Sequence, residues 1–112
     1  MEQEKIEIRS HSMGLDIVFM VTGGTAHIGA MATAYVTEDR TVRTEVLSLP
    51  GHREGELAAE LAQMASLALE RTVAVLVGIH LHQPTKQDIE TIVVEANRQM
   101  RHVLDQWKDR TD

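Results

Sequence analysis

The chain of 112 residues contains no cysteine, which excludes disulfide bonds, thiolate nucleophiles and thiolate metal ligands. Aromatic residues are scarce as well, since Phe19, Tyr35 and Trp107 are the only three. Basic residues are outnumbered, and the net charge of −6 opposes binding to a phosphate backbone. We therefore expect no nucleic-acid partner, and any metal site would need histidine and carboxylate ligands.

Long apolar runs are also missing. The longest uninterrupted run, residues 17–21, is far too short to cross a bilayer, and the first residues do not have the pattern of a secretory leader. These features predict a soluble, cytoplasmic protein with no membrane partner. The length predicts one domain, residues 1–112, which is small enough that pairing with a second copy would add noticeably to its stability.

The first half of the sequence predicts four strands. Residues 4–11 alternate between apolar and charged side chains, as in a half-buried edge strand, whereas residues 15–22 are almost wholly apolar, as in a strand near the sheet centre. The glycine pair at 23–24 ends this second strand and begins a tight connection to a third, residues 27–36. A fourth strand spans residues 42–49. Four strands in succession predict an antiparallel meander.

The second half of the sequence adds two helices and one strand. Residues 54–71 have apolar positions at three- and four-residue steps, which indicates an amphipathic helix, and residues 72–78 form an apolar run typical of an interior strand. Thr85 and Asp88 have the spacing of a helix capping box, and the helix that follows should end near Lys108. The order ββββαβα predicts an α+β fold, a mostly antiparallel sheet with both helices on one face. Its uncovered second face is expected to need a partner sheet.

Three short segments combine glycine with histidine at the ends of predicted elements: residues 23–29, 50–55 and 78–82. Glycine lets backbone N–H groups approach a ligand closely, and histidine can donate a hydrogen bond, accept one or bind a metal near neutral pH. If the protein has a binding site, these segments are where we expect it.

In the first two segments, the chemistry favours an anion. The N–H groups of a turn at Gly23, Gly24 and Thr25 can receive a phosphate or carboxylate oxygen, with His27 beside them, although the glycines can also serve a plain hairpin turn. The second segment lies at a helix start, where Arg53 offers a planar fork for phosphate. The alternative is a surface loop in which Arg53 and its neighbour His52 are merely solvated.

The third segment places His80 and His82 two residues apart at a strand end. Together with His27 or His52, this pair could form a three-histidine zinc site, but the sequence contains no His-x-x-x-His or His-Glu-x-x-His spacing, so we predict no metal. No serine lies in a nucleophile elbow, so nucleophilic catalysis is not indicated. The methionines, Met20 and Met31 among them, are interpreted as packing residues.

Three motifs in this order resemble one known family. Gly-Gly-Thr-Ala-His-Ile-Gly at 23–29, Pro-Gly-His-Arg-Glu at 50–54 and Gly-Ile-His at 78–80, followed by Pro-Thr-Lys-Gln-Asp-Ile, are similar to the LpdD-type small subunit that is encoded with UbiD-type decarboxylases. The resemblance covers about residues 14–107. It implies a chaperone for reduced prenylated flavin mononucleotide (prFMN), with a fold like that of proteasome assembly chaperones, which pair through their sheets.

The resemblance thus implies a non-catalytic homodimer that hands reduced prFMN to an apo-decarboxylase of the UbiD type. The family-like positions are His27, His52 and His80 with the glycines beside them, and the turn and helix-start chemistry adds Thr25 and Arg53. The predicted cofactor-binding residues are Gly23, Gly24, Thr25, His27, Gly51, His52, Arg53 and His80. Two other functions fit the residues: a small histidine-dependent metalloenzyme and a protein assembly chaperone without a small ligand.

Overall fold

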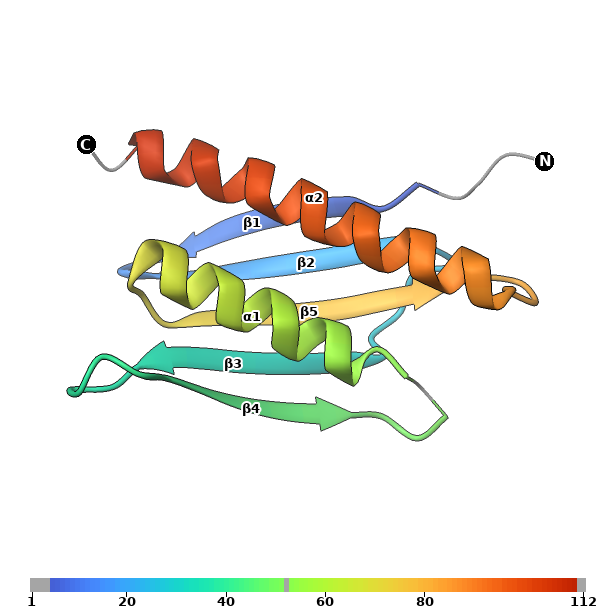
Figure 1. Ribbon diagram of the computed structural model, residues 1–112, viewed down its shortest axis with the longest axis horizontal. Helices are drawn as coiled ribbons and strands as arrows, with labels where there is room; N and C mark the ends of the chain where they lie inside the picture. Colours follow the sequence, from blue (N-terminus) through green and yellow to red (C-terminus); the bar gives the residue numbers. More distant parts are fainter. Residues whose placement is uncertain (1–4, 52, 111–112) are drawn as a thin grey trace.

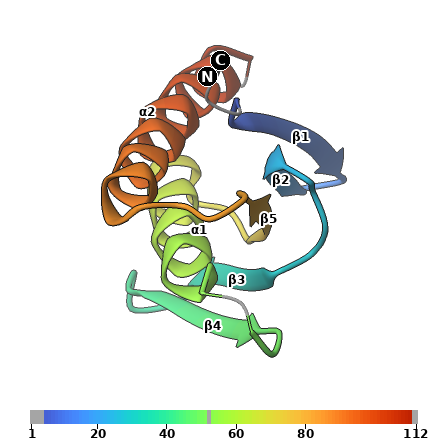
Figure 2. The same ribbon diagram turned by 90° about the vertical axis from the view of Figure 1, so that its right-hand side faces the viewer.

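The computed structural model describes residues 5–51 and 53–110. In it, two helices cover one face of a five-stranded sheet, so that the described chain forms two layers (Figures 1 and 2). The elements in chain order are β1 (Glu7–Met13), β2 (Asp16–Gly24), β3 (Ala30–Val36), β4 (Val42–Ser48), α1 (Gly55–Leu69), β5 (Val73–His80) and α2 (Lys86–Arg110). The predicted α+β class, the order ββββαβα and the placement of both helices on one face are confirmed.

The predicted meander is wrong, because the strand order is β1-β2-β5-β3-β4. β5 lies between β2 and β3 and pairs in parallel with β2, while the other three pairings are antiparallel. The predicted tight connection at the glycine pair is wrong as well: β2 continues through Gly23 and Gly24, and residues 25–29 then cross β5 to reach β3. The predicted interior strand at residues 72–78 is confirmed, since β5 has a hydrogen-bonded neighbour on both edges. Which strands are those neighbours does not follow from local sequence patterns.

The core lies between the sheet and the helices. Phe19 on β2 and Val75 on β5 point into it and are completely buried, as alternation along each strand requires. On β3 the inward positions are alanines, Ala32 among them, and α1 contributes further buried alanines such as Ala62. These small side chains let α1 lie close against β3.

The start of α2 is closed by the capping box that the sequence predicts. The backbone N–H of Thr85 donates to Asp88 Oδ2 over 2.9 Å, and the backbone N–H of Asp88 donates to Thr85 Oγ1 over 3.0 Å. In the described part of the chain no helix combines the length and the apolar character that a membrane span needs. The long α2 has one charged face and one apolar face.

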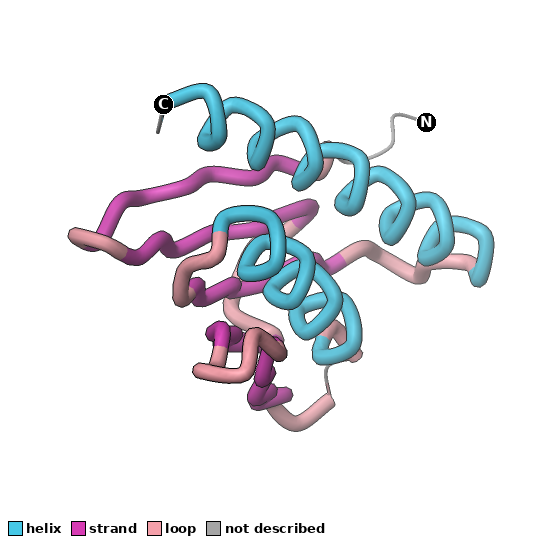
Figure 3. Tube along the Cα trace, turned by 60° about the vertical axis from the view of Figure 1, so that its left-hand side comes forward, coloured by secondary structure: helices cyan, strands magenta, loops and turns pink. Residues whose placement is uncertain are grey.

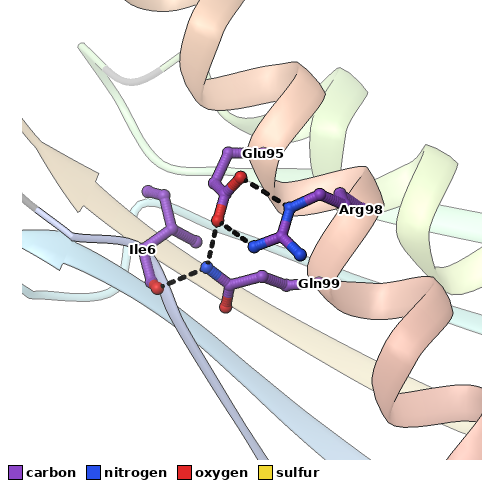
Figure 4. A network of polar contacts seen from close by, with 4 residues as sticks. All are labelled: Ile6, Glu95, Arg98 and Gln99. Carbon is purple, nitrogen blue, oxygen red and sulfur yellow. Dashed lines mark hydrogen bonds and ion pairs between the residues drawn. The ribbon is translucent and has the colours of Figure 1, made fainter.

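The first described residues are tied to α2, which runs alongside β1 (Figure 3). Gln99 Nε2 donates to the backbone oxygen of Ile6 and to Glu95, both over 2.8 Å (Figure 4). Arg98 forms a two-pronged ion pair with the same carboxylate, and its hydrogen bonds, followed by that of Gln99, lower the pKa of Glu95 to about 2. Because Glu95 stays ionised at neutral pH, the network holds the segment that enters β1 at a fixed place beside β2.

Candidate functional site

The three glycine- and histidine-containing segments meet at one end of the molecule. The loops 25–29, 49–51 with 53–54, and 81–85 all lie where β2 and β5 end and where both helices begin (Figure 1, right). Ligands collect at the carboxyl ends of parallel strands, and the N-terminal ends of helices favour anions. The topology thus places these segments at the end of the fold where the parallel strands end and both helices begin.

Backbone hydrogen bonds connect the loop at 25–29 to both of its neighbours. The N–H of Thr25 donates to the oxygen of His80 over 3.2 Å, and the N–H of Gly29 donates to the oxygen of Val77 over 2.9 Å. On the other side, the N–H of Leu49 donates to the oxygen of Gly29 over 2.9 Å. The loop is therefore fixed to the end of β5 and to the chain that leaves β4.

His27 and His80, which are far apart in the sequence, lie side by side in this region. Their ring centroids are 5.5 Å apart, the rings are tilted by 44°, and both residues are exposed. The close approach depends on Gly78, because a Cβ atom there would lie 1.8 Å from the backbone oxygen of His27. Glycine at this position lets the crossing loop rest directly on β5 and brings the two imidazoles together.

The two glycines before the loop have different roles. Gly23 is buried on the helix side of the sheet, where an added Cβ would lie 2.8 Å from the Ile6 side chain and 3.4 Å from that of Ile79. Gly24 has φ of 66°, a left-handed conformation that glycine adopts without strain, and it starts the turn into the exposed Thr25. Gly23 thus serves packing, whereas Gly24 and Thr25 lie at the surface beside His80.

The structure describes part of the second segment, residues 50–55. Gly51 is exposed and has φ of 81°, which accounts for glycine there, and Arg53 is exposed next to the start of α1. His52 lies outside the described residues. Glu54 is the N-cap residue of α1 and Glu56 lies in its first turn, so the positive end of this helix is partly balanced.

An apolar surface that is not predicted above lies on the same face of the sheet as His80, four residues back along β5. The outer face of the sheet, which is the face away from the helices, has one row of side chains that crosses all five strands in register: Arg9, Met20, Leu76, Met31 and Leu47. Met20 and Met31, interpreted above as packing residues, lie here, and Met31 is 38% exposed. The sequence does contain a signal for this surface. Residues 17–21 are all apolar, so the side chains that point to either face of this strand are apolar.

The chemistry of this region suits an anionic ligand with a flat apolar part. Two imidazoles can donate hydrogen bonds to an anion, and the outer face offers thioether and aliphatic groups farther along the same strands. Within residues 5–51 and 53–110, no group of three or more His, Cys, Asp or Glu side chains is arranged to hold a metal ion. Three shallow hollows formed by described residues lie elsewhere, along α2 and around the β3–β4 turn.

Comparison with solved structures gives a relative for the fold. The crystal structure of a chaperone complex for yeast 20S proteasome assembly superposes with a TM-score of 0.62, over 96% of this chain and 98% of that chain, at 14% sequence identity. None of the curated proteins compared with the chain matches it significantly. The structural likeness confirms the predicted proteasome-assembly-chaperone fold.

Comparison with protein families gives a match over nearly the whole length. The family model described as a prenylated flavin chaperone LpdD-like domain matches residues 1–108, which include all three glycine- and histidine-containing segments and the outer-face row. The chain therefore belongs to the LpdD-like family of prenylated flavin chaperones.

Proposed function

We propose that this protein is a non-catalytic carrier that binds reduced prFMN and delivers it to a UbiD-type decarboxylase in the cytoplasm. Membership of the LpdD-like family supports a prenylated flavin as the ligand. The structural observation that supports it best is the His27–His80 pair, which stands at the end of the parallel strands β2 and β5, on the sheet that carries the apolar row of Met20, Leu76 and Met31 on its outer face. A carrier needs binding groups but no catalytic ones, and it must release its cargo, so moderate affinity is expected.

In this proposal the phosphate of prFMN binds at the end of the sheet. His27 and His80 donate hydrogen bonds to it, and the surrounding loops and helix starts add backbone donors and a favourable field. The backbone N–H of Thr25 already donates to the backbone oxygen of His80, so Thr25 would contribute its hydroxyl. The full set of proposed binding residues is Gly23, Gly24, Thr25, His27, Gly51, His52, Arg53 and His80, with Gly23 acting through packing.

The flavin ring would lie on the outer face. Met20, Leu76 and Met31 form an apolar floor there, and methionine adapts to a flat ring through its flexible, polarisable thioether. This floor compensates for the shortage of aromatic residues. A second copy of the chain that covers the same face would close a pocket over the ring, as binding sites for largely apolar ligands require.

The direct test is anaerobic binding. We expect the purified protein to retain reduced prFMN through anaerobic gel filtration, with a flavin absorbance and a mass that correspond to the complex. Addition of an apo-decarboxylase of the UbiD type should then transfer the flavin and restore decarboxylation.

Two results would contradict the carrier function. Stoichiometric zinc in protein purified without a histidine tag, with no flavin retained, would favour a histidine-dependent metalloenzyme. Binding to the decarboxylase that is unchanged by alanine at His27, His52 and His80, again with no flavin retained, would favour a chaperone that acts on the protein alone.

The proposed homodimer has its own test. The outer face is apolar in the centre and charged at its edge strands, where Glu7 and Arg9 lie on β1 and Arg43 and Glu45 on β4, as is typical of a protein interface. We expect wild type to sediment at twice the chain mass of 12.5 kDa. Leu76→Glu, in the central strand, should weaken dimerisation roughly 100-fold, because it buries an unpaired charge.

Leu67→Glu is the matched control, since Leu67 is 58% exposed on α1, in the opposite layer. It adds the same charge and should leave the mass at that of a dimer. Circular dichroism shows whether Leu76→Glu remains folded. A folded Leu76→Glu variant that is as dimeric as wild type would exclude this face as the interface.

A further inference from the structure

Lys5 lies next to the proposed phosphate site, although the sequence gives no hint of it. The register of β1 and β2 pairs Glu7 with Thr22 on the outer face. An added Cβ at Gly23 would contact both the Ile6 side chain and the backbone oxygen of Lys5, so the chain continues beside β2 before β1 begins. Continuing the register by two residues places Lys5 opposite Gly24.

Residues two apart on a strand point to the same face, so Lys5 shares the outer face with Glu7. Gly24 in turn pairs with His80. Lys5, Gly24 and His80 therefore form one row across the end of the outer face. Ile6, Gly23 and Ile79 form the next row, on the helix side, where Ile6 is buried.

Gly24 leaves an opening in this row because it has no side chain. Adjacent strands are about 4.8 Å apart, so the Cα atoms of Lys5 and His80 are separated by about 10 Å, with only the Gly24 backbone between them. The flexible side chain of lysine can extend over such a distance toward the imidazole. A phosphate group held by His27 and His80 would lie within its reach.

Among the described residues, none forms an ion pair with Lys5. Glu7, two residues along on the same face, instead accepts a hydrogen bond from Arg9 Nε over 2.8 Å. Lys5 itself is exposed. Its position is also fixed, since the neighbouring Ile6 is held by Gln99 of α2.

We propose that Lys5 supplies the ammonium group that completes the phosphate site with His27 and His80. This inference rests on the proposed function and adds a charged residue to its site. Lys5 lies on the β1 side of Gly24, whereas the crossing loop lies on the β5 side. An ammonium group suits a phosphate dianion as a compact point charge, and two imidazoles alone leave part of that charge unbalanced.

The test compares two lysine variants with two ligands. Lys5→Gln and Lys86→Gln remove the same charge at the same end of the molecule, but Lys86 begins α2 in the helix layer and is not on the outer face. The ligands are reduced prFMN and the same flavin after removal of its phosphate. Lys5→Gln should weaken prFMN binding about five- to tenfold, because one charge-assisted contact is lost, and should leave binding of the dephosphorylated flavin unchanged.

Lys86→Gln should change neither affinity by more than about twofold, because a single exposed charge on the other layer is screened by salt. Equal losses in both lysine variants, an equal loss for both ligands, or no loss in Lys5→Gln would overturn the role of Lys5 while the carrier function stands. If wild type binds neither flavin, the carrier function fails and the role of Lys5 fails with it.

Discussion

Gly78→Ala is expected to destabilise the folded protein by about 3 kcal/mol, at the upper end of the usual cost of overpacking. The added Cβ would lie 1.8 Å from the backbone oxygen of His27 and 2.6 Å from its carbonyl carbon. Rotation of a side chain cannot relieve a contact with the backbone, so the crossing loop must move off β5. His27 then separates from His80, and the hydrogen bond from Gly29 to Val77 is strained or lost.

The free energy of unfolding from urea titration measures this effect, and Gly14→Ala is its control. Gly14 has φ of 62° with nothing within 4 Å of an added Cβ, so alanine there introduces backbone strain of about 1 kcal/mol without a clash. Gly78 does not have a positive φ, and its cost is therefore steric. If the two variants lose equal stability, the loop does not rest on β5 as described.

Strands can be located from the sequence because their burial leaves a local pattern along the chain. The neighbours of each strand in the sheet leave no such local pattern. The apolar runs at residues 17–21 and 73–77 predict strands at the right places. Nothing in either run indicates that the two pair in parallel, with Phe19 beside Val75. The predicted meander fails for this reason: a pairing between segments more than fifty residues apart is decided by packing of the whole chain against α1 and α2.

The candidate site, too, can be predicted from the sequence only in part. Glycine and histidine at strand ends mark three segments in the sequence, and the structure places all three at the end of the fold where β2 and β5 end. Their role in one binding site stays a prediction. The role of each glycine depends on what crosses it. Gly23 faces Ile6 and Gly78 faces the backbone of His27, and neither contact follows from spacing. Lys5 is not predicted as a site residue either, because its position beside the site depends on the register in which β1 pairs with β2.

The His27→Ala, His80→Ala double variant is expected to weaken the binding of reduced prFMN by more than about 100-fold. Each imidazole provides a hydrogen bond to the phosphate, and bonds to charged groups contribute about 1.5 to 3 kcal/mol apiece, so the loss of two exceeds any effect of Lys5 alone. Both residues are exposed, which means that the fold should tolerate their removal. Anaerobic titration followed by flavin absorbance gives the affinity, and urea titration gives the stability.

The matched control is His82→Ala, His102→Ala, which removes two other exposed histidines, one of them only two residues beyond His80. It should leave flavin affinity within about twofold of wild type, since neither ring is part of the proposed site. A coupling test sharpens the argument, because rings 5.5 Å apart that hold one phosphate should not act independently. The single variants should therefore have effects that do not sum to that of the double variant. Strict additivity would indicate that the two imidazoles contact different parts of the ligand, and an unaffected double variant would remove them from the binding site altogether.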